Sequence, residues 1–212
     1  MKPTKADFTR EEWQVIQQHR TPAQVQNFLR TLAYNREKQG ATCISFRKVI
    51  EKRLAHCLEG ALTAAVILEQ HGYPPLMVSI ESKDHLDHVL LLYEHRGKYG
   101  SVARSRDTAL HGRQPVFRRV RDLVMSYFDA YVDKTGRIKG YAVADLNDLG
   151  NYDWRFSEKN VWKVEHYLQD IPHRAINGSE LRYQKNLRRY LKFHAEYPDR
   201  SPDYFANKHT WL

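Results

Sequence analysis

Two side chains in this sequence are of the types that cysteine-dependent acyl transfer requires, Cys57 and His88. A catalytic thiol must be partly ionised, and a base must reach it. Cys57 stands at the predicted start of an apolar helix, where unpaired backbone N–H groups and the helix dipole favour a thiolate. His88 begins a predicted strand further along the chain, and histidine titrates near neutral pH. We therefore predict Cys57 as the nucleophile and His88 as the base.

The base also needs a group that orients it. The chain that follows the next hairpin turn contains two candidates. A two-residue turn centred on Arg96-Gly97 places His88 opposite Ser105, whereas a four-residue loop at 96–99 places it opposite Asp107. Because a carboxylate stabilises an imidazolium more strongly than a hydroxyl does, Asp107 is the favoured third residue. Ser105 is the alternative.

Acyl transfer also develops a negative charge on the carbonyl oxygen, and this oxyanion needs hydrogen-bond donors. The backbone N–H of Cys57 is one candidate, and the side-chain amide of Asn35 is the other. The alternative interpretation of Asn35 is a residue that ends a helix.

Several neighbouring polar residues receive no catalytic role. His56 is interpreted as an ordinary helix-entry residue, the alternative being a group that supports the thiol. Glu59 lies in the first turn of its helix, where a carboxylate suits the dipole, but its charge would oppose a nearby thiolate. Cys43 has no helix start and no obvious base beside it, so we expect it to pack in the core. The run from Asp84 to His88 is interpreted as a polar loop, and we expect no metal and no cofactor.

The elements that must position these residues follow from hydrophobic spacing, capping residues and turn residues. An apolar, alanine-rich stretch at 55–68 predicts a helix that is buried nearly all round and stops at His71-Gly72. The order of helices, then a strand meander, then helices predicts an α+β fold. We expect one domain over 1–212, with a core at about 45–150 and helical extensions at 8–44 and 154–212. The expected helices are 9–20, 21–34, 46–54, 120–131 and 180–197, and the expected strands are 76–80, 87–93 and 99–105.

Composition limits the class of protein. The chain has 212 residues, a 42% hydrophobic fraction and a formal net charge of +9. Two cysteines cannot form a disulfide scaffold, the N-terminal residues lack the apolar stretch of a signal peptide, and no segment is apolar over the length of a membrane span. We expect a cytoplasmic protein with free thiols and no membrane association. The partner is expected to be a peptide or amide substrate, and the positive net charge favours an acidic one. Nucleic acid is an unlikely partner, since the basic runs match no binding motif.

Four segments of the chain together resemble the transglutaminase-like superfamily. The resemblance covers roughly residues 45–110 and rests on Cys57-Leu58-Glu59-Gly60-Ala61, on Leu68 with His71-Gly72-Tyr73-Pro74-Pro75-Leu76, on Asp87-His88-Val89 and on Gly97-Lys98-Tyr99-Gly100. More loosely, the whole chain looks like an uncharacterised bacterial branch of that superfamily. The sequence departs from the family pattern at Ala55, where the family usually has glycine, and at His56, where it often has a small or polar residue. Around His88 and the third position, the family's His-x-Trp and Asp-Pro-Thr patterns are missing.

The resemblance implies a papain-like fold, in which the cysteine helix packs on an antiparallel sheet that carries the histidine and the acid. It implies a cysteine-dependent amide hydrolase or acyltransferase that works through a thioester, as peptidases, amidases and transglutaminases do. The alternatives are a catalytically inactive binding scaffold with the same fold and, less favoured, a basic protein that associates with nucleic acid.

Overall fold

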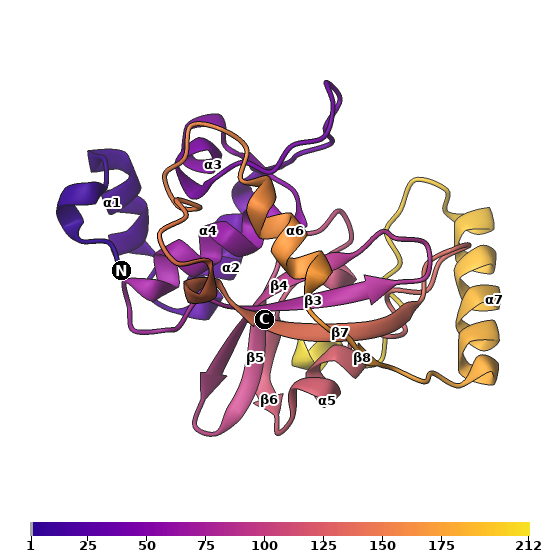
Figure 1. Cartoon of the computed structure of the whole chain (residues 1–212). Coiled ribbons are helices and arrows are strands. Elements are labelled where there is room, and N and C mark those ends of the chain that lie inside the picture. Colours follow the sequence, from indigo (N-terminus) through magenta and orange to yellow (C-terminus); the bar gives the residue numbers. More distant parts are fainter. Residues whose placement is uncertain (1) are drawn as a thin grey trace.

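A six-stranded antiparallel sheet with the order β6-β5-β4-β3-β7-β8 forms the centre of this protein (Figure 1). The computed structural model describes residues 2–212 and has an α+β fold, as the order of elements predicts. A short parallel pair, β1 with β2, lies outside the sheet. The strands are β1 (Ala33–Tyr34), β2 (Leu54–Ala55), β3 (Leu76–Ser82), β4 (His88–His95), β5 (Lys98–Val102), β6 (Arg113–Phe117), β7 (Ile138–Asp145) and β8 (Arg174–Ala175).

Helices pack on both faces of this sheet. The α-helices are α1 (Arg10–Gln18), α2 (Pro22–Thr31), α3 (Phe46–Lys52), α4 (Cys57–Glu69), α5 (Val120–Met125), α6 (Trp162–Asp170) and α7 (Glu180–Glu196). Short 3-10 helices are η1 (Lys5–Asp7), η2 (Thr108–Leu110), η3 (Leu146–Leu149) and η4 (Lys208–Thr210). The predicted caps form: Thr9 and Thr21 each accept a backbone N–H in the first turn of α1 and α2.

Side chains alternate along β4 between two hydrophobic cores, as the period of a strand requires. Val89, Leu91 and Tyr93 pack with the helices α1 to α4 and α6. Leu90 and Leu92 pack on the other face, in the core to which α5 contributes. The strand is therefore buried on both faces. The N-terminal helices and α6 share the core of α4, so the expected extensions on both sides of it contribute to the same core.

The helix α4 is the most deeply buried helix of the fold. Every residue from Leu58 to Glu69 is buried, which confirms the prediction of a helix that is apolar nearly all round. Its far end is held by a buried ion pair, in which Arg155 donates two hydrogen bonds to Glu69 at 2.9 and 2.7 Å. Gly72 then reverses the chain with a φ of +88°, a conformation that favours glycine.

The β4–β5 hairpin decides which residues lie near His88. Its turn has two residues, Arg96 and Gly97, because His95 pairs with Lys98. Both turn residues have positive φ, 51° and 73°, as the tightest hairpins require. The predicted strand to Ser105 is too long, since β5 ends at Val102. The buried side chain of Gln26 bonds the N–H and the C=O of Ala103, and so replaces the next pair of the ladder.

Two further differences from the predicted elements concern the second half of the chain. α5 ends at Met125 rather than near Tyr131, and the residues after it form turns. The strands β6 and β7 and the helix α6 were not predicted. α7 confirms the predicted C-terminal helix, although none of its residues is buried. Among the described residues, no helix combines the length and the apolar character that crossing a membrane requires.

Gly60 lies where α4 meets the chain that leaves β5, and this contact gives a testable prediction. A Cβ built at Gly60 lies 2.6 Å from the Cβ of Arg104, closer than side chains pack. Gly60→Ala should therefore destabilise the fold by about 1–3 kcal/mol through overpacking. Helix propensity alone predicts the opposite, a gain of about 1 kcal/mol. Urea unfolding distinguishes the two.

The control is the same substitution in an Arg104→Gly background, where the opposing Cβ is absent. There the cost of Gly60→Ala should shrink or reverse. A higher urea midpoint for Gly60→Ala alone would show that α4 and Arg104 are not in tight contact.

Candidate active site

A cleft of about 650 Å³ lies at the end of the sheet where the two helical layers meet. Its wall includes Cys57 from the start of α4 and His88 from the start of β4. The loops at 34–42, 105–110 and 130–136 complete the wall, together with side chains of α6, α7 and the C-terminal segment. The cleft has the size of a small-molecule or peptide side-chain site.

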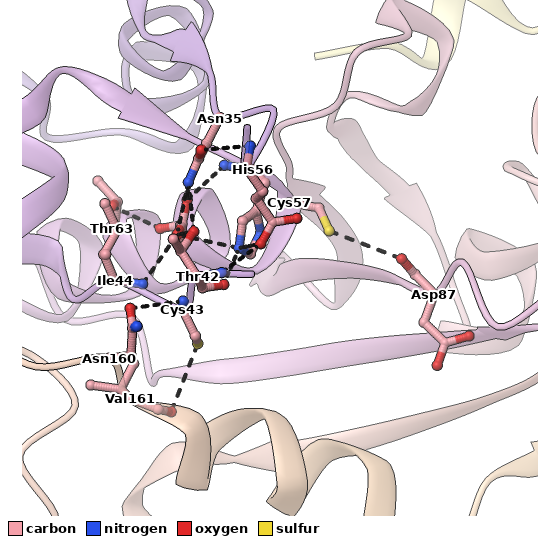
Figure 2. A network of polar contacts seen from close by, with 12 residues as sticks. Asn35, Thr42, Cys43, Ile44, His56, Cys57, Thr63, Asp87, Asn160 and Val161 are labelled. Carbon is pink, nitrogen blue, oxygen red and sulfur yellow. Dashed lines mark hydrogen bonds and ion pairs between the residues drawn. The ribbon is translucent and has the colours of Figure 1, made fainter. Parts of the chain in front are cut away.

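Cys57 is the first residue of α4 and is half-buried. Its Sγ points away from the helix toward the start of β4, where the carbonyl oxygen of Asp87 lies 4.0 Å away (Figure 2). Burial opposes ionisation of this thiol, but hydrogen bonds from His56 and His88 outweigh it and lower its pKa to about 5. A thiol with this pKa is largely a thiolate at neutral pH, which is the nucleophilic form.

His88 is buried at the start of β4, on the face that packs against Tyr127 and Tyr131. Its Nε2 lies 2.9 Å from the carbonyl oxygen of Leu110. Because a carbonyl only accepts, Nε2 carries a proton, and Nδ1 is the nitrogen left to exchange a proton with the thiol. Cys57 and His88 line the same cleft, and His88 is among the groups that lower the pKa of the thiol.

The group that orients His88 is a backbone carbonyl, which corrects the expected contact with Asp107 or Ser105. With a two-residue turn, the hairpin does not carry Asp107 opposite His88, and the ladder ends before Ser105 is reached. The Ser105 hydroxyl instead accepts the backbone N–H of Asp107 at 3.3 Å. Asp107 is the N-cap of η2, and the last residue of η2, Leu110, supplies the carbonyl. Asp107 and Ser105 both remain part of the cleft wall.

Asn35 does not face the thiol as an oxyanion donor would, which corrects the second expectation. Its Nδ2 donates to the carboxylate of Glu59, at 3.0 and 3.2 Å, and to the hydroxyl of Thr42 at 2.8 Å. The amide protons are therefore committed to a buried anion. The backbone N–H of Cys57, in the unpaired first turn of α4, keeps its place as a candidate donor.

Sequence reasoning missed the importance of Glu59 and His56. Glu59 is fully buried beneath the start of α4 and accepts the backbone N–H groups of Ile44 and His56 at 3.1 and 2.9 Å. Burial opposes its ionisation, but hydrogen bonds, led by that of His56, lower its pKa to about 2. The signal was present in the sequence: a glutamate three residues after a helix N-cap reaches back to the cap N–H.

Cys43 is buried, as predicted, and its Sγ lies 3.7 Å from the carbonyl oxygen of Val161. Burial raises the pKa of its thiol, so it stays protonated. The two thiols of the chain therefore differ sharply in ionisation.

The polar run from Asp84 to His88 forms a turn. Asp84 accepts hydrogen bonds from the hydroxyl of Ser82 at 2.5 Å and from the N–H of Leu86 at 3.2 Å. Within residues 2–212, no three or more histidine, cysteine or acidic side chains are grouped as metal ligands.

Comparison with known proteins returns no assignment. No protein-family model matches this chain. No curated protein matches it either. The functional argument therefore rests on the geometry of the cleft.

The difference between the two thiols gives a prediction. The rate of alkylation by iodoacetamide follows the thiolate fraction. For Cys57 it should rise through a midpoint near pH 5 and stay level above about pH 6, because the folded-state pKa of this thiol is about 5. Cys43 should stay unlabelled in the folded protein. Mass spectrometry of tryptic peptides measures both sites, and Cys57→Ser is the control that removes the reactive site. Equal slow labelling of both thiols would contradict the arrangement.

Proposed function

We propose that this protein is a cysteine-dependent amide hydrolase or acyltransferase, with Cys57 as nucleophile and His88 as general acid and base. The observation that supports it is the meeting of a half-buried, acidified thiol and a proton-carrying imidazole in one cleft. A buried structural cysteine, such as Cys43, has neither the exposure nor the ionisation.

The first half of the reaction forms a thioester. The thiolate of Cys57 attacks the carbonyl carbon of an amide, and the electron pair of the carbonyl moves onto its oxygen. The backbone N–H of Cys57 and the N-terminal dipole of α4 stabilise this oxyanion. When the oxyanion collapses, the C–N bond breaks and the imidazolium of His88 gives its Nδ1 proton to the departing amine.

The second half releases the acyl group. His88, now neutral, takes a proton from water or from a second amine as this nucleophile attacks the thioester. The C–S bond breaks and returns the thiolate and the imidazolium. Water yields a carboxylic acid, as in a peptidase or amidase, and an amine yields a new amide, as in a transglutaminase. The Leu110 carbonyl, 2.9 Å from Nε2, holds the ring in the tautomer that both steps need.

The architecture supports the finer proposal of a transglutaminase-like, papain-like fold. In that arrangement a helix that begins with the nucleophile packs on an antiparallel sheet, and a strand of the sheet carries the histidine. Here α4 begins with Cys57 and packs on β4, which begins with His88. A backbone carbonyl, that of Leu110, takes the place of a side-chain acid and orients the ring by accepting a hydrogen bond from it.

The charges that line the cleft favour a neutral or cationic substrate rather than the acidic one that net charge suggests. Six carboxylate residues line it, against two arginines, Arg36 and Arg106, and the charged ring of His56. The acidic residues of the wall are Glu37, Asp84, Asp87, Asp107, Asp133 and Glu165. A negatively charged peptide would be repelled from most of this surface, so the substrate segment next to the scissile amide should carry no acidic side chain.

Substitution of the two central residues tests the proposal. A fluorogenic peptide-amide library and p-nitrophenyl acetate serve as probes, since an activated ester acylates a competent thiolate without a matched substrate. The native protein should show a burst of about one p-nitrophenolate per chain, and Cys57→Ala should show none. His88→Asn should lower amide turnover by about 10²–10⁴-fold, the usual contribution of general acid–base catalysis. Cys43→Ala is the matched control and should keep full activity.

One outcome would replace this function by the inactive-scaffold alternative. If Cys57 alkylates as a thiolate but the native protein neither shows the ester burst nor cleaves any library member, the cleft binds ligands without turning them over.

A further inference from the structure

A second histidine, His56, stands directly before Cys57 in the chain and is paired with a buried anion. His56 is the N-cap of α4, directly before Cys57. Its Nε2 lies 2.9 Å from the carbonyl oxygen of Thr42 and 3.3 Å from Oε1 of Glu59. Figure 2 shows His56 and Thr42 on one side of the Cys57 sulfur, while Asp87 lies on the other.

The surroundings of Glu59 require a positive charge close by. The carboxylate is fully buried and ionised, and removing an isolated carboxylate from water is costly. Its other partners are neutral: the amide of Asn35, the hydroxyl of Thr42 and two backbone N–H groups. Among residues 2–212, His56 is the cation-forming side chain within ion-pair distance of it.

The contacts of His56 favour its imidazolium form. Nε2 faces three acceptors, namely the Thr42 carbonyl, Glu59 and, at 3.9 Å, the carboxylate of Glu37. The thiol of Cys57, on the next residue of the chain, is a further group whose negative form favours the charged ring. Burial alone would disfavour the charge, but hydrogen bonds to Cys57 and Glu59 outweigh it and raise the pKa of His56 to about 11.

The other charged or titratable groups near the thiol come from four segments. His88 and Asp87 belong to the start of β4, Tyr34 to β1, Arg106 to the loop after β5, and Tyr131 to the turns after α5. Both tyrosines stay neutral at physiological pH, because burial, the largest effect on each, raises their pKa, to about 12 for Tyr34. Of these groups, His88 also lowers the pKa of the thiol, while the carbonyl oxygen of Asp87 lies 4.0 Å from its Sγ.

We propose that His56, held by the buried carboxylate of Glu59, is a positioning residue that keeps Cys57 ionised, so that His88 is free to carry the proton. The inference deepens the proposed function and rests on Cys57 being its nucleophile. His56 cannot act as the shuttle itself, because releasing its proton would leave Glu59 as an unpaired buried anion. His88 has a neutral carbonyl behind it, so the movement of its proton leaves no buried carboxylate without a partner.

The first test measures ionisation without any substrate. His56→Gln removes the charge but keeps an amide that can donate to the Thr42 carbonyl. The midpoint of iodoacetamide alkylation of Cys57 should rise by at least about one pH unit, which lowers the alkylation rate at pH 5 severalfold or more. His85→Gln is the matched control, because His85 is an exposed histidine of the same cleft. It should leave the midpoint where it is.

The second test separates the two histidines by their pH–rate profiles on the best substrate of the library. In His56→Gln the acidic limb should move to higher pH together with the alkylation midpoint, while kcat at about pH 9 stays within a few-fold of native. His88→Asn should lose turnover at every pH. Nitrogen-15 NMR of labelled histidine gives a third readout, in which the resonances lost in His56→Gln report an imidazolium up to pH 9 or above.

Two results would overturn the inference. An alkylation profile of His56→Gln that superimposes on the native one would show that His56 only caps α4. A neutral His56 ring at pH 8 would show that Glu59 is not its counter-ion. Absence of amide turnover would refute the proposed function while leaving the alkylation and NMR results to decide this inference.

Discussion

The carboxylate of Glu59 is the constraint around which the cleft is built. A buried anion is tolerated only when donors surround it, and the donors here come from three separate stretches of chain: Asn35, the Thr42–Ile44 segment and His56. Because these donors must reach the carboxylate, the segment that follows α2 packs across the start of α4. That same segment forms one wall of the cleft, next to the free thiol.

The position of the cleft follows from how the sheet is packed. β4 is buried on both faces. The side chain of His88 points to the same face of the sheet as those of Leu90 and Leu92, which is the face away from α4. A histidine in the middle of the strand on that face would be separated from the helix by the sheet. Only at the first residue of β4, where the sheet ends, can its ring reach the thiol at the start of α4. The site therefore forms where the start of α4 and the start of β4 lie close together, at the edge of both hydrophobic cores.

Two local rules that are usually considered structural have chemical consequences here. The N-cap position of α4 supplies His56 beside the thiol, and the N3 position supplies the glutamate that holds it. The side chain of Gln26 ends β5 early by bonding Ala103, so the chain leaves the sheet and returns through η2. That detour brings the Leu110 carbonyl to His88. A longer hairpin ladder would have left Ser105 opposite His88.

The sequence by itself determined the elements whose signals are local: the capped helices α1 and α2, and the apolar helix α4 with Cys57 at its start. It left the turn at 96–99 open between two and four residues. It also indicated that Cys57 and His88 would meet, because a buried helix must pack on the strand that follows it. Only the tertiary structure decided the partners of these two residues. The oxygen behind His88, the commitment of Asn35 to a buried anion and the pairing of His56 with Glu59 all depend on atoms brought together from distant segments. Hydrophobic periodicity and capping patterns report burial and local backbone geometry, whereas these contacts depend on where each chain segment finds a partner for its polar groups.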